Sequence, residues 1–327
     1  MVDQDGLTGL FGQLPGFFPK FPWFGGDLQT LRNVLRPPRA SLTAWPGQPI
    51  AFDTADGTGD RLLAELHQPA EASRPLPLVI LVHGLTGSMD SSYIRVSAMH
   101  LLRAGYPVLR LNLRGAGPSR GLTRGFYHAG RSDDLHQVIG QLDGRLAGNG
   151  IALVGFSLGG NVVLKYLAER GQLAPIMAAV SISAPIDLAA TQREIGRRRN
   201  RRYHDFLLKE MKVERPCPSG IDRIVDFDDQ VVAPANGFAD AADYYRQSSA
   251  KPLLPAIRRP TLLIHAANDP WIPGHIYRDI DPASNRRLRL LLPRSGGHVG
   301  FHGIGLDRPW HDLAIARFLE FAARGQI

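Results

Sequence analysis

Apolar and polar positions along the chain follow two patterns in turn, one typical of buried strands and one typical of helices. Residues 78–82 form a continuous run of leucine and β-branched residues, which favours a buried parallel strand. Residues 92–103 have helical spacing and are followed by Gly105, a typical helix end. This alternation continues to about residue 186. It predicts right-handed crossovers and a parallel sheet covered by helices on both faces.

The same two patterns predict the remaining elements. Short apolar runs predict strands at 108–113, 151–155, 177–183, 261–266 and 288–292. Helical spacing predicts helices at 132–146, 158–168 and 309–323, and Ser132 is in position to cap the first of them. The fold class is therefore α/β, with one doubly wound, mostly parallel sheet.

The alternation is interrupted between about residues 187 and 255. This stretch contains a run of arginines, Cys217 between two prolines, the acidic segment 226–229 and the pair Tyr244-Tyr245. It is too long for a loop without secondary structure in a compact domain. We therefore expect a helical cap insertion that covers one end of the sheet, within a domain that extends over residues 46–327.

Residues 1–45 are expected to form an N-terminal arm. The arm is rich in aromatic residues, namely Phe11, Phe17, Phe18, Phe21, Trp23 and Phe24. Its prolines and glycines interrupt any amphipathic helix, so packing against the body of the protein is favoured over peripheral contact with a membrane.

The strongest local motif is Gly155-Phe156-Ser157-Leu158-Gly159, which lies between a predicted strand and a predicted helix. A sharp turn from strand to helix forces its central residue into a strained conformation and needs small residues two positions before and after it. Such a turn exposes the serine oxygen at the edge of the sheet, beside the positive end of the helix. Ser157 is therefore the candidate nucleophile.

A serine hydroxyl needs a base to accept its proton, and position must select that base among 11 histidines. In this architecture the partners follow in the order serine, acid, histidine, on loops at the same sheet edge. His298 lies between glycines just after the last predicted strand, which makes it the candidate base. His302 and His311 are expected to be surface or capping residues, and His265 is expected inside a strand.

The acid that orients the imidazole is predicted to be Asp269. It follows the predicted strand 261–266 closely, and Pro270 restricts the turn after it. Asp187 is an alternative because it follows another strand, and Asp228 or Asp229 would serve if the insertion folded inward.

Charge that develops on a carbonyl oxygen needs preset hydrogen-bond donors. The backbone N–H of Leu158, directly after the nucleophile, is one candidate. The second is the N–H of Leu85, in the loop His83-Gly84-Leu85-Thr86-Gly87 after the strand at 78–82.

Composition narrows the class of protein. The chain has 327 residues, of which 44% are hydrophobic and 21% charged, as in ordinary folded proteins. No apolar run approaches the roughly 20 residues of a membrane-spanning helix, and the N-terminus lacks the order of a signal peptide. The single cysteine excludes an internal disulfide and a thiolate metal cluster. We therefore expect a soluble, cytoplasmic protein.

The net charge of +8 does not by itself indicate a nucleic-acid partner. The one dense basic run, at 197–202, lacks the aromatic or glycine pattern of a nucleic-acid module, so a solvated helix face is expected. The segment after Arg114 lacks the spacing and the lysine of a phosphate-binding loop, and no histidines have the spacing of a zinc site. No cofactor and no metal are predicted.

Together these motifs resemble the α/β-hydrolase superfamily, and within it the YheT-type predicted hydrolases, which are related to plant embryogenesis-associated and animal abhydrolase-domain proteins. The matching stretches include Leu28-Gln29-Thr30, Tyr127-His128-Ala129-Gly130, Gly155 to Asn161, Phe227-Asp228-Asp229, Tyr244-Tyr245, Asn268-Asp269-Pro270 and Gly297-His298. The arm departs from the family pattern at Asp27, where a histidine is expected. The resemblance implies a serine carboxylesterase or lipase-like activity, with Ser157, Asp269 and His298 as the catalytic triad.

The expected function is hydrolysis of carboxylic esters with short or medium acyl chains, through an acyl-serine intermediate. The expected partner is a small-molecule ester, and the oligomeric state is open. An acyltransferase or a thioesterase would use the same three residues. A non-catalytic binding protein that uses the arginine run as its contact surface is the alternative from another class.

Overall fold

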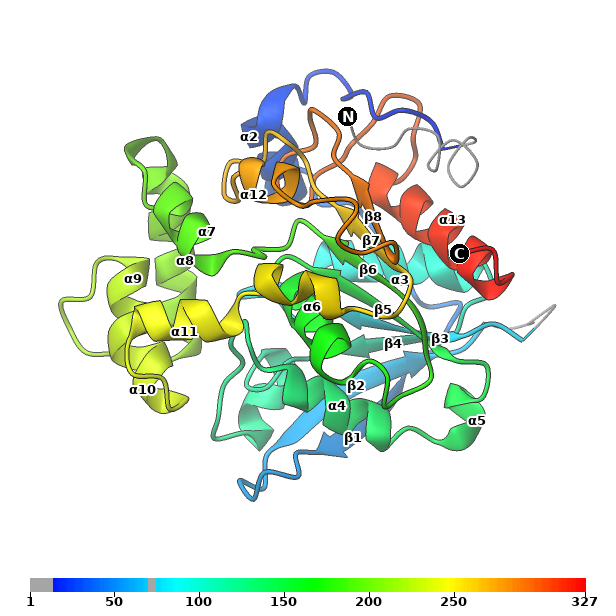
Figure 1. Cartoon of the computed structure of the whole chain (residues 1–327), viewed down its shortest axis with the longest axis horizontal. Coiled ribbons are helices and arrows are strands. Elements are labelled where there is room, and N and C mark those ends of the chain that lie inside the picture. The colour runs from blue at the N-terminus through cyan, green and yellow to red at the C-terminus, as the bar shows by residue number, and fades with distance from the viewer. Residues whose placement is uncertain (1–13, 70–74) are drawn as a thin grey trace.

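The computed structural model describes residues 14–69 and 75–327, which are built around a sheet of eight strands (Figure 1). The strands are β1 (Gln48–Asp53), β2 (Arg61–His67), β3 (Leu78–Val82), β4 (Val108–Leu111), β5 (Ile151–Phe156), β6 (Ile176–Ile182), β7 (Thr261–Ile264) and β8 (Leu288–Leu291). Their order is β1-β2-β4-β3-β5-β6-β7-β8, in which β3 to β8 are parallel and β1 and β2 are antiparallel to their neighbours. The predicted doubly wound, mostly parallel sheet is confirmed.

Two layers of apolar side chains, one on each face of the sheet, form the core. On β3, Leu78, Ile80 and Val82 belong to one layer, whereas Val79 and Leu81 belong to the other. The first layer packs against α4 (Ser132–Gly140) and α6 (Leu158–Arg170). The second packs against α3 (Ser92–Arg103) and α13 (Trp310–Ala323). Burial on both faces explains why β3 shows no alternation of apolar and polar residues.

The secondary structure differs from the sequence prediction in three places. The apolar pattern does not predict β1 or β2. In β1 only Phe52 is buried and Pro49 follows the first residue, and in β2 the polar residues Arg61, Glu65 and His67 interrupt the apolar run. The predicted helix 132–146 ends at Gly140, and the short helix α5 (Gly144–Ala147) follows it. Ser132 was expected to cap this helix, which is wrong: the cap position is Arg131, and the Ser132 hydroxyl donates to Glu169 over 2.6 Å.

Between β6 and β7 the chain forms a helical cap, which lies to one side of the sheet (Figure 1). Its elements are α7 (Leu188–Ile195), η2 (Arg198–Asn200), α8 (Arg201–Glu214), α9 (Ile224–Phe227), η3 (Asp228–Val232), α10 (Ala233–Ala235), α11 (Ala241–Ser248) and η4 (Lys251–Ala256). Two further short helices lie elsewhere, η1 (Gly117–Leu122) and α12 (His275–Arg278). No helix within the described ranges combines the length and the apolar character that crossing a bilayer requires.

The described part of the arm, residues 14–45, contains the helix α2 (Gly25–Leu35), and its aromatic side chains are placed in different surroundings. Phe17 packs edge-on against Phe301 and Trp310, with ring centroids 5.8 and 6.0 Å away. Phe18, Phe21 and Phe24 are instead exposed. Phe11 lies outside the described residues.

A buried amide joins the cap to the core. Asn161, on α6, donates from Nδ2 to the carbonyl oxygens of Ala129 (2.9 Å) and Ser248 (2.7 Å). Its Oδ1 accepts from the N–H of Ala250 over 3.0 Å. One side chain therefore satisfies two backbone groups at the end of the cap and one in the loop before α4, which would otherwise be buried without partners.

We expect Asn161→Ala to lower the free energy of unfolding by about 3 kcal/mol, because it leaves buried backbone groups unpaired. Chemical denaturation measures this change. Asn149→Ala, at an exposed position, is the matched control and should change stability by less than about 0.5 kcal/mol. Equal effects of the two substitutions would contradict the anchoring role of Asn161.

Candidate active site

Ser157 lies in a sharp turn between β5 and α6. Its backbone has φ 50° and ψ −124°, a conformation that is strained for any residue other than glycine. Glycines make room for the turn. A Cβ atom at Gly155 would lie 2.4 Å from the carbonyl oxygen of Gly159, and one at Gly159 would lie 2.3 Å from that of His83. The turn therefore places Ser157 at the edge of the sheet, directly before the N-terminus of α6.

Three side chains from distant parts of the chain meet at this edge. His298 Nε2 is 3.0 Å from Ser157 Oγ, and His298 Nδ1 is 2.8 Å from Asp269 Oδ2. The three residues follow β5, β7 and β8, whose parallel carboxyl ends share one edge of the sheet. The structure thus brings together the three residues that the sequence selected.

The carboxylate of Asp269 has no exposed side-chain surface. Burial acts to raise its pKa, but the charge and hydrogen bond of His298 and the N–H of Trp271 act in the opposite direction, and the net effect lowers the pKa. Its Oδ1 accepts from the N–H groups of Trp271 (2.8 Å) and Ile272 (3.1 Å), which leaves Oδ2 for His298. An ionised carboxylate at this position favours a proton on Nδ1, so that Nε2 can accept a proton from Ser157.

The other carboxylates considered for this role are engaged elsewhere. Asp187 caps α7 by accepting from the N–H of Ala190 over 2.9 Å. Asp229 accepts from the N–H of Ala241 over 2.9 Å. Asp228 accepts from the Tyr245 hydroxyl over 2.6 Å.

The predictions for three histidines are wrong. His302 and His311 were expected to be surface or capping residues, but both are buried. The His302 ring lies between α2 side chains, 3.0 Å from Arg32 Nη1 and 2.8 Å from Asn33 Oδ1. Burial lowers the pKa of each ring to about 3, so both are neutral. His265 was expected inside a strand, but β7 ends at Ile264 and His265 follows it; the imidazole stacks on Tyr277, with ring centroids 4.1 Å apart.

The Trp271 ring fixes the plane of the His298 imidazole. The two rings are stacked with centroids 4.2 Å apart and an interplanar angle of 28°. Trp271 itself packs against Tyr203 of the cap helix α8. This role of Trp271 was not predicted, although its position two residues after Asp269 is a local signal for it.

The two backbone groups predicted to face a developing oxyanion, those of Leu85 and Leu158, belong to residues that line the cavity beside Ser157. The loop that carries Leu85 is held by Tyr127, whose hydroxyl accepts from the N–H of Thr86 (2.7 Å) and donates to Glu214 of the cap (2.7 Å). Gly84 is required in this loop because a Cβ atom there would lie 2.9 Å from the Cβ of Ser157.

The arm helix α2 holds the loop that carries His298. Thr30 Oγ1 accepts from the N–H of His298 (2.8 Å), and Asn33 Nδ2 donates to the carbonyl oxygen of Val299 (2.9 Å). Gln29 accepts from the N–H of His302 over 2.7 Å. Val299 has φ 54°, an unfavourable value for a β-branched residue, so the loop needs such external support.

A cavity of about 480 Å³ opens beside Ser157 and His298 between the sheet edge, the cap and α2. Most of its lining is apolar, and includes Leu31, Val34, Leu85, Leu158, Leu188, Ile195, Phe206, Leu207, Met211, Ile224, Trp271 and Ile272. Such a cavity with a few polar groups at one side is typical of a site for a small apolar ligand.

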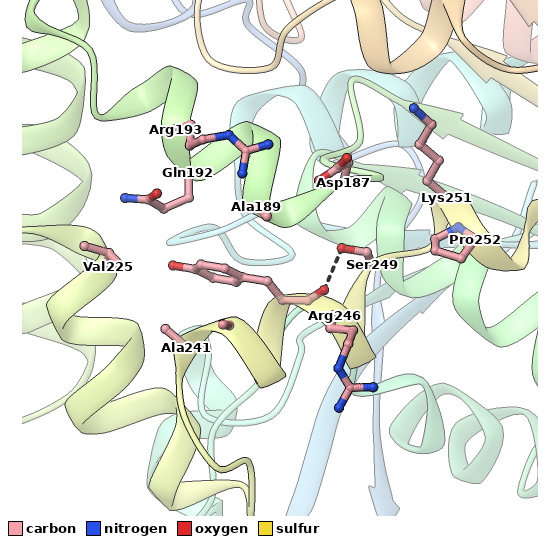
Figure 2. Close-up of a pocket in the computed structure, with 12 residues that line it drawn as sticks. Asp187, Ala189, Gln192, Arg193, Val225, Ala241, Arg246, Ser249, Lys251 and Pro252 are labelled. Carbon is pink, nitrogen blue, oxygen red and sulfur yellow. Dashed lines mark hydrogen bonds between the residues drawn. The ribbon is translucent and has the colours of Figure 1, made fainter.

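A second cavity, of about 450 Å³, lies within the cap (Figure 2). Figure 2 shows Gln192 and Arg193 of α7 on one side of it and Arg246 of α11 on another, with Lys251 nearby. Tyr245 and Gln192 line both cavities, whereas Ser157, Asp269 and His298 do not line this one. It is therefore separate from the predicted chemistry.

A family model described as the alpha/beta hydrolase family matches residues 79–316. The chain belongs to this family.

YheT of Escherichia coli is 32% identical over 274 residues, a match that covers 79% of this chain and 80% of YheT. The monoacylglycerol lipase of Saccharomyces cerevisiae is 30% identical over 268 residues, which cover 75% of this chain but only 59% of the lipase. The embryogenesis-associated protein EMB8 of Picea glauca is 28% identical, with 77% of this chain and 60% of EMB8 covered. The chain is thus a YheT-type α/β-hydrolase.

Solved structures show the same fold. The esterase Pf2001 of Pyrococcus furiosus superposes with a TM-score of 0.59 and 17% identity, over 86% of this chain and 96% of that one. A 2,6-dihydroxy-pseudo-oxynicotine hydrolase superposes with a TM-score of 0.60 and 19% identity, over 91% of this chain and 72% of that one.

Asp228 is an acidic group in the wall of the apolar cavity. It lies at the start of the π-helical turn η3, and its carboxyl accepts from Tyr245. Burial raises its pKa to about 7, and the hydrogen bond from Tyr245 and the charge of Arg215 only partly oppose this. The folded protein therefore keeps this carboxyl protonated over a pH range in which the unfolded chain ionises it.

This difference predicts a pH-dependent stability. Between about pH 4 and 7 the folded state binds the proton of Asp228 more tightly, so its contribution to stability is present at low pH and is lost as the pH rises. The side chain that Asp228→Asn introduces cannot ionise. As the pH rises from 4.5 to 8, we therefore expect the free energy of unfolding of the variant to increase by roughly 2–4 kcal/mol relative to that of the native chain. Chemical denaturation of both proteins across this range measures the difference. A difference that does not vary with pH would contradict the prediction.

Proposed function

We propose that the protein is a serine hydrolase that cleaves carboxylic esters with short or medium acyl chains through an acyl-serine intermediate. The observation that carries the proposal is the pair of contacts from His298, 3.0 Å to Ser157 Oγ and 2.8 Å to the buried carboxylate of Asp269. Together they supply a nucleophile, a base and a group that orients the base.

In the first half of the reaction, Ser157 Oγ attacks the ester carbonyl carbon while His298 Nε2 accepts the hydroxyl proton. The carbonyl oxygen becomes an oxyanion, to which the N–H groups of Leu85 and Leu158 donate; each such donor contributes about 10²–10³-fold to turnover. The tetrahedral intermediate then collapses. The bond to the alcohol oxygen breaks, His298 returns the proton to the leaving alcohol, and the acyl group remains on Ser157.

In the second half, a water molecule takes the place of the alcohol. His298 accepts its proton as the water oxygen attacks the acyl carbon, and Ser157 leaves with that proton restored to its hydroxyl. The products are a carboxylic acid and the free enzyme. Asp269 keeps its negative charge throughout and stabilises the imidazolium that forms in each half.

The apolar cavity supports an ester with a hydrocarbon acyl chain as substrate. A medium chain is removed from water there, and burial of each CH₂ contributes about 0.8 kcal/mol to binding. The names of the relatives point the same way, because they include an esterase, a monoacylglycerol lipase and a medium-chain fatty acid ethyl ester synthase/esterase. The last name also supports a second activity, in which an alcohol instead of water attacks the same acyl-serine.

Ser157→Ala should lower hydrolysis of p-nitrophenyl esters by about 10⁴-fold or more and abolish labelling by a fluorophosphonate probe, because the nucleophile is lost. A series of esters from acetate to laurate measures the acyl preference, and added ethanol or a thioester separates hydrolase from transferase or thioesterase. Ser219→Ala, at an exposed position, is the control and should keep full activity and labelling. Full turnover by correctly folded Ser157→Ala would refute the assignment.

Thr30 is expected to act as a positioning residue, because its hydroxyl accepts from the N–H of His298. Thr30→Val should lower kcat about tenfold and leave KM within about twofold, since one hydrogen bond that orients the base is lost. Thr30→Ser keeps the hydroxyl and should restore kcat. Equal kcat values for the valine and serine variants would show that the hydrogen bond does not position His298.

A further inference from the structure

Helix α2 carries its polar residues on the inside and its apolar residues on the outside. Gln29 and Thr30 are buried, whereas the exposed fractions of Leu28, Leu31 and Leu35 are 42%, 36% and 64%. A surface helix of a globular protein normally has the opposite arrangement.

The inward polar face has a structural reason, which the outward apolar face lacks. Gln29, Thr30 and Asn33 hydrogen-bond to the loop that carries His298, as described above. Phe24, Leu28, Leu31 and Leu35 recur at helical spacing on the outer face, and Val34 beside them is 70% exposed. This apolar face is left open to solvent by the residues that the structure describes.

The apolar face is continuous with the cavity at Ser157. Leu31 and Val34 line that cavity, and so does Phe206 of α8, which is 50% exposed. The cap is joined to α2 at this point, since Asp27 accepts from Arg199 (3.0 Å) and from the Tyr203 hydroxyl (3.1 Å). Apolar surface thus leads from the outside of the protein to the candidate nucleophile.

Cations surround this surface on both elements. Arg36 directly follows α2, and the arginine run 197–202 covers η2 and the start of α8. The nearby carboxylates are already paired, Asp27 with Arg199 and Asp205 with Arg201. Arg36, Arg198 and Arg202 have no ion pair with any residue in the described ranges, so the rim carries a net positive charge.

We propose that this face binds the surface of an anionic lipid membrane, from which a lipid ester passes directly into the cavity. The docking face consists of Phe24, Leu28, Leu31, Val34, Leu35 and Phe206. The delivery of substrate rests on the proposed esterase function, whereas the binding to lipid does not.

Apolar side chains surrounded by arginines match the chemistry of such a surface. The side chains enter the boundary between headgroups and acyl chains, and the guanidinium groups contact lipid phosphates. A second copy of this chain fits the face less well, because a symmetric pair would bring two arginine runs together. The mouth of an apolar cavity within the docking face gives a lipid chain a path that does not cross water.

The test uses the Ser157→Ala protein, which leaves the lipid intact. The protein is mixed either with vesicles of phosphatidylcholine or with vesicles of phosphatidylcholine that contain 30% phosphatidylglycerol, and the fraction that sediments with the vesicles is measured. We expect binding to the anionic vesicles that weakens with salt, and at least tenfold weaker binding to the zwitterionic ones. No sedimentation, or equal affinity for the two kinds of vesicle, would overturn the proposal.

Two pairs of substitutions locate the binding surface. Leu28→Gln with Leu35→Gln removes apolar contacts at positions that do not line the cavity, and Arg36→Gln with Arg198→Gln removes unpaired cations. Each pair should weaken binding to anionic vesicles about tenfold or more. Leu173→Gln, 71% exposed in the native chain, and Arg145→Gln are matched controls elsewhere on the surface and should bind as before.

The outcomes separate the two proposals. The Leu28→Gln, Leu35→Gln variant in an otherwise native chain should hydrolyse a water-soluble ester normally but act at least fivefold more slowly on the same ester class in anionic vesicles. Vesicle binding without any ester hydrolysis would refute the proposed function and leave the docking face standing. If these substitutions changed the oligomeric state and not the vesicle binding, the face would be a contact between copies and the docking proposal would fail.

Discussion

The buried carboxylate of Asp269 is the constraint around which the site is organised. A carboxylate without exposed surface is stable only if hydrogen bonds and an opposite charge compensate its lost hydration. The N–H groups of Trp271 and Ile272 fill one oxygen, so the other is left to the imidazole of His298. The hydrogen bond between His298 Nδ1 and Asp269 Oδ2 therefore both stabilises the buried carboxylate and orients the imidazole. Trp271 adds a second restraint, because it both donates to the carboxylate and stacks on the imidazole.

The loop that carries His298 is strained and depends on the N-terminal arm. Val299 and Phe301 both have positive φ values, and hydrogen bonds with Thr30, Asn33 and Gln29 hold the backbone of residues 298–302 on either side of them. The arm is thus part of the site and not an appendage to it. Because the polar residues of α2 face inward to make these contacts, its apolar residues face outward. The helix that holds the loop of the candidate base thus also carries the surface that we propose binds lipid.

The cap completes the cavity without supplying a reacting group. Tyr127 joins the loop of Leu85 to Glu214 of the cap, and Asn161 joins the end of the cap to the core. Polar groups of the cap therefore fix its position, while its apolar side chains form the cavity wall. Asp228 is the exception among them, because it places a protonated carboxyl in that wall. Arg114, which begins the segment judged unlike a phosphate-binding loop, is buried and forms ion pairs with Asp60 and Asp134.

The parallel strands and the positions of Ser157, Asp269 and His298 could be predicted from sequence because each depends on a local rule. Buried strands need unbroken apolar runs, and the turn at Ser157 needs glycines at fixed offsets. Local rules failed for β1, in which only Phe52 is buried, and for His302 and His311, whose burial is decided by segments far away in the chain. They also gave no reason to expect α2 to turn its polar side inward, because the hydrogen-bonding partners of Gln29 and Thr30 lie about 270 residues later. The sequence by itself determined the parallel strands and the candidate site residues; only the tertiary structure decided which distant backbone groups needed partners, and hence which surface was left apolar.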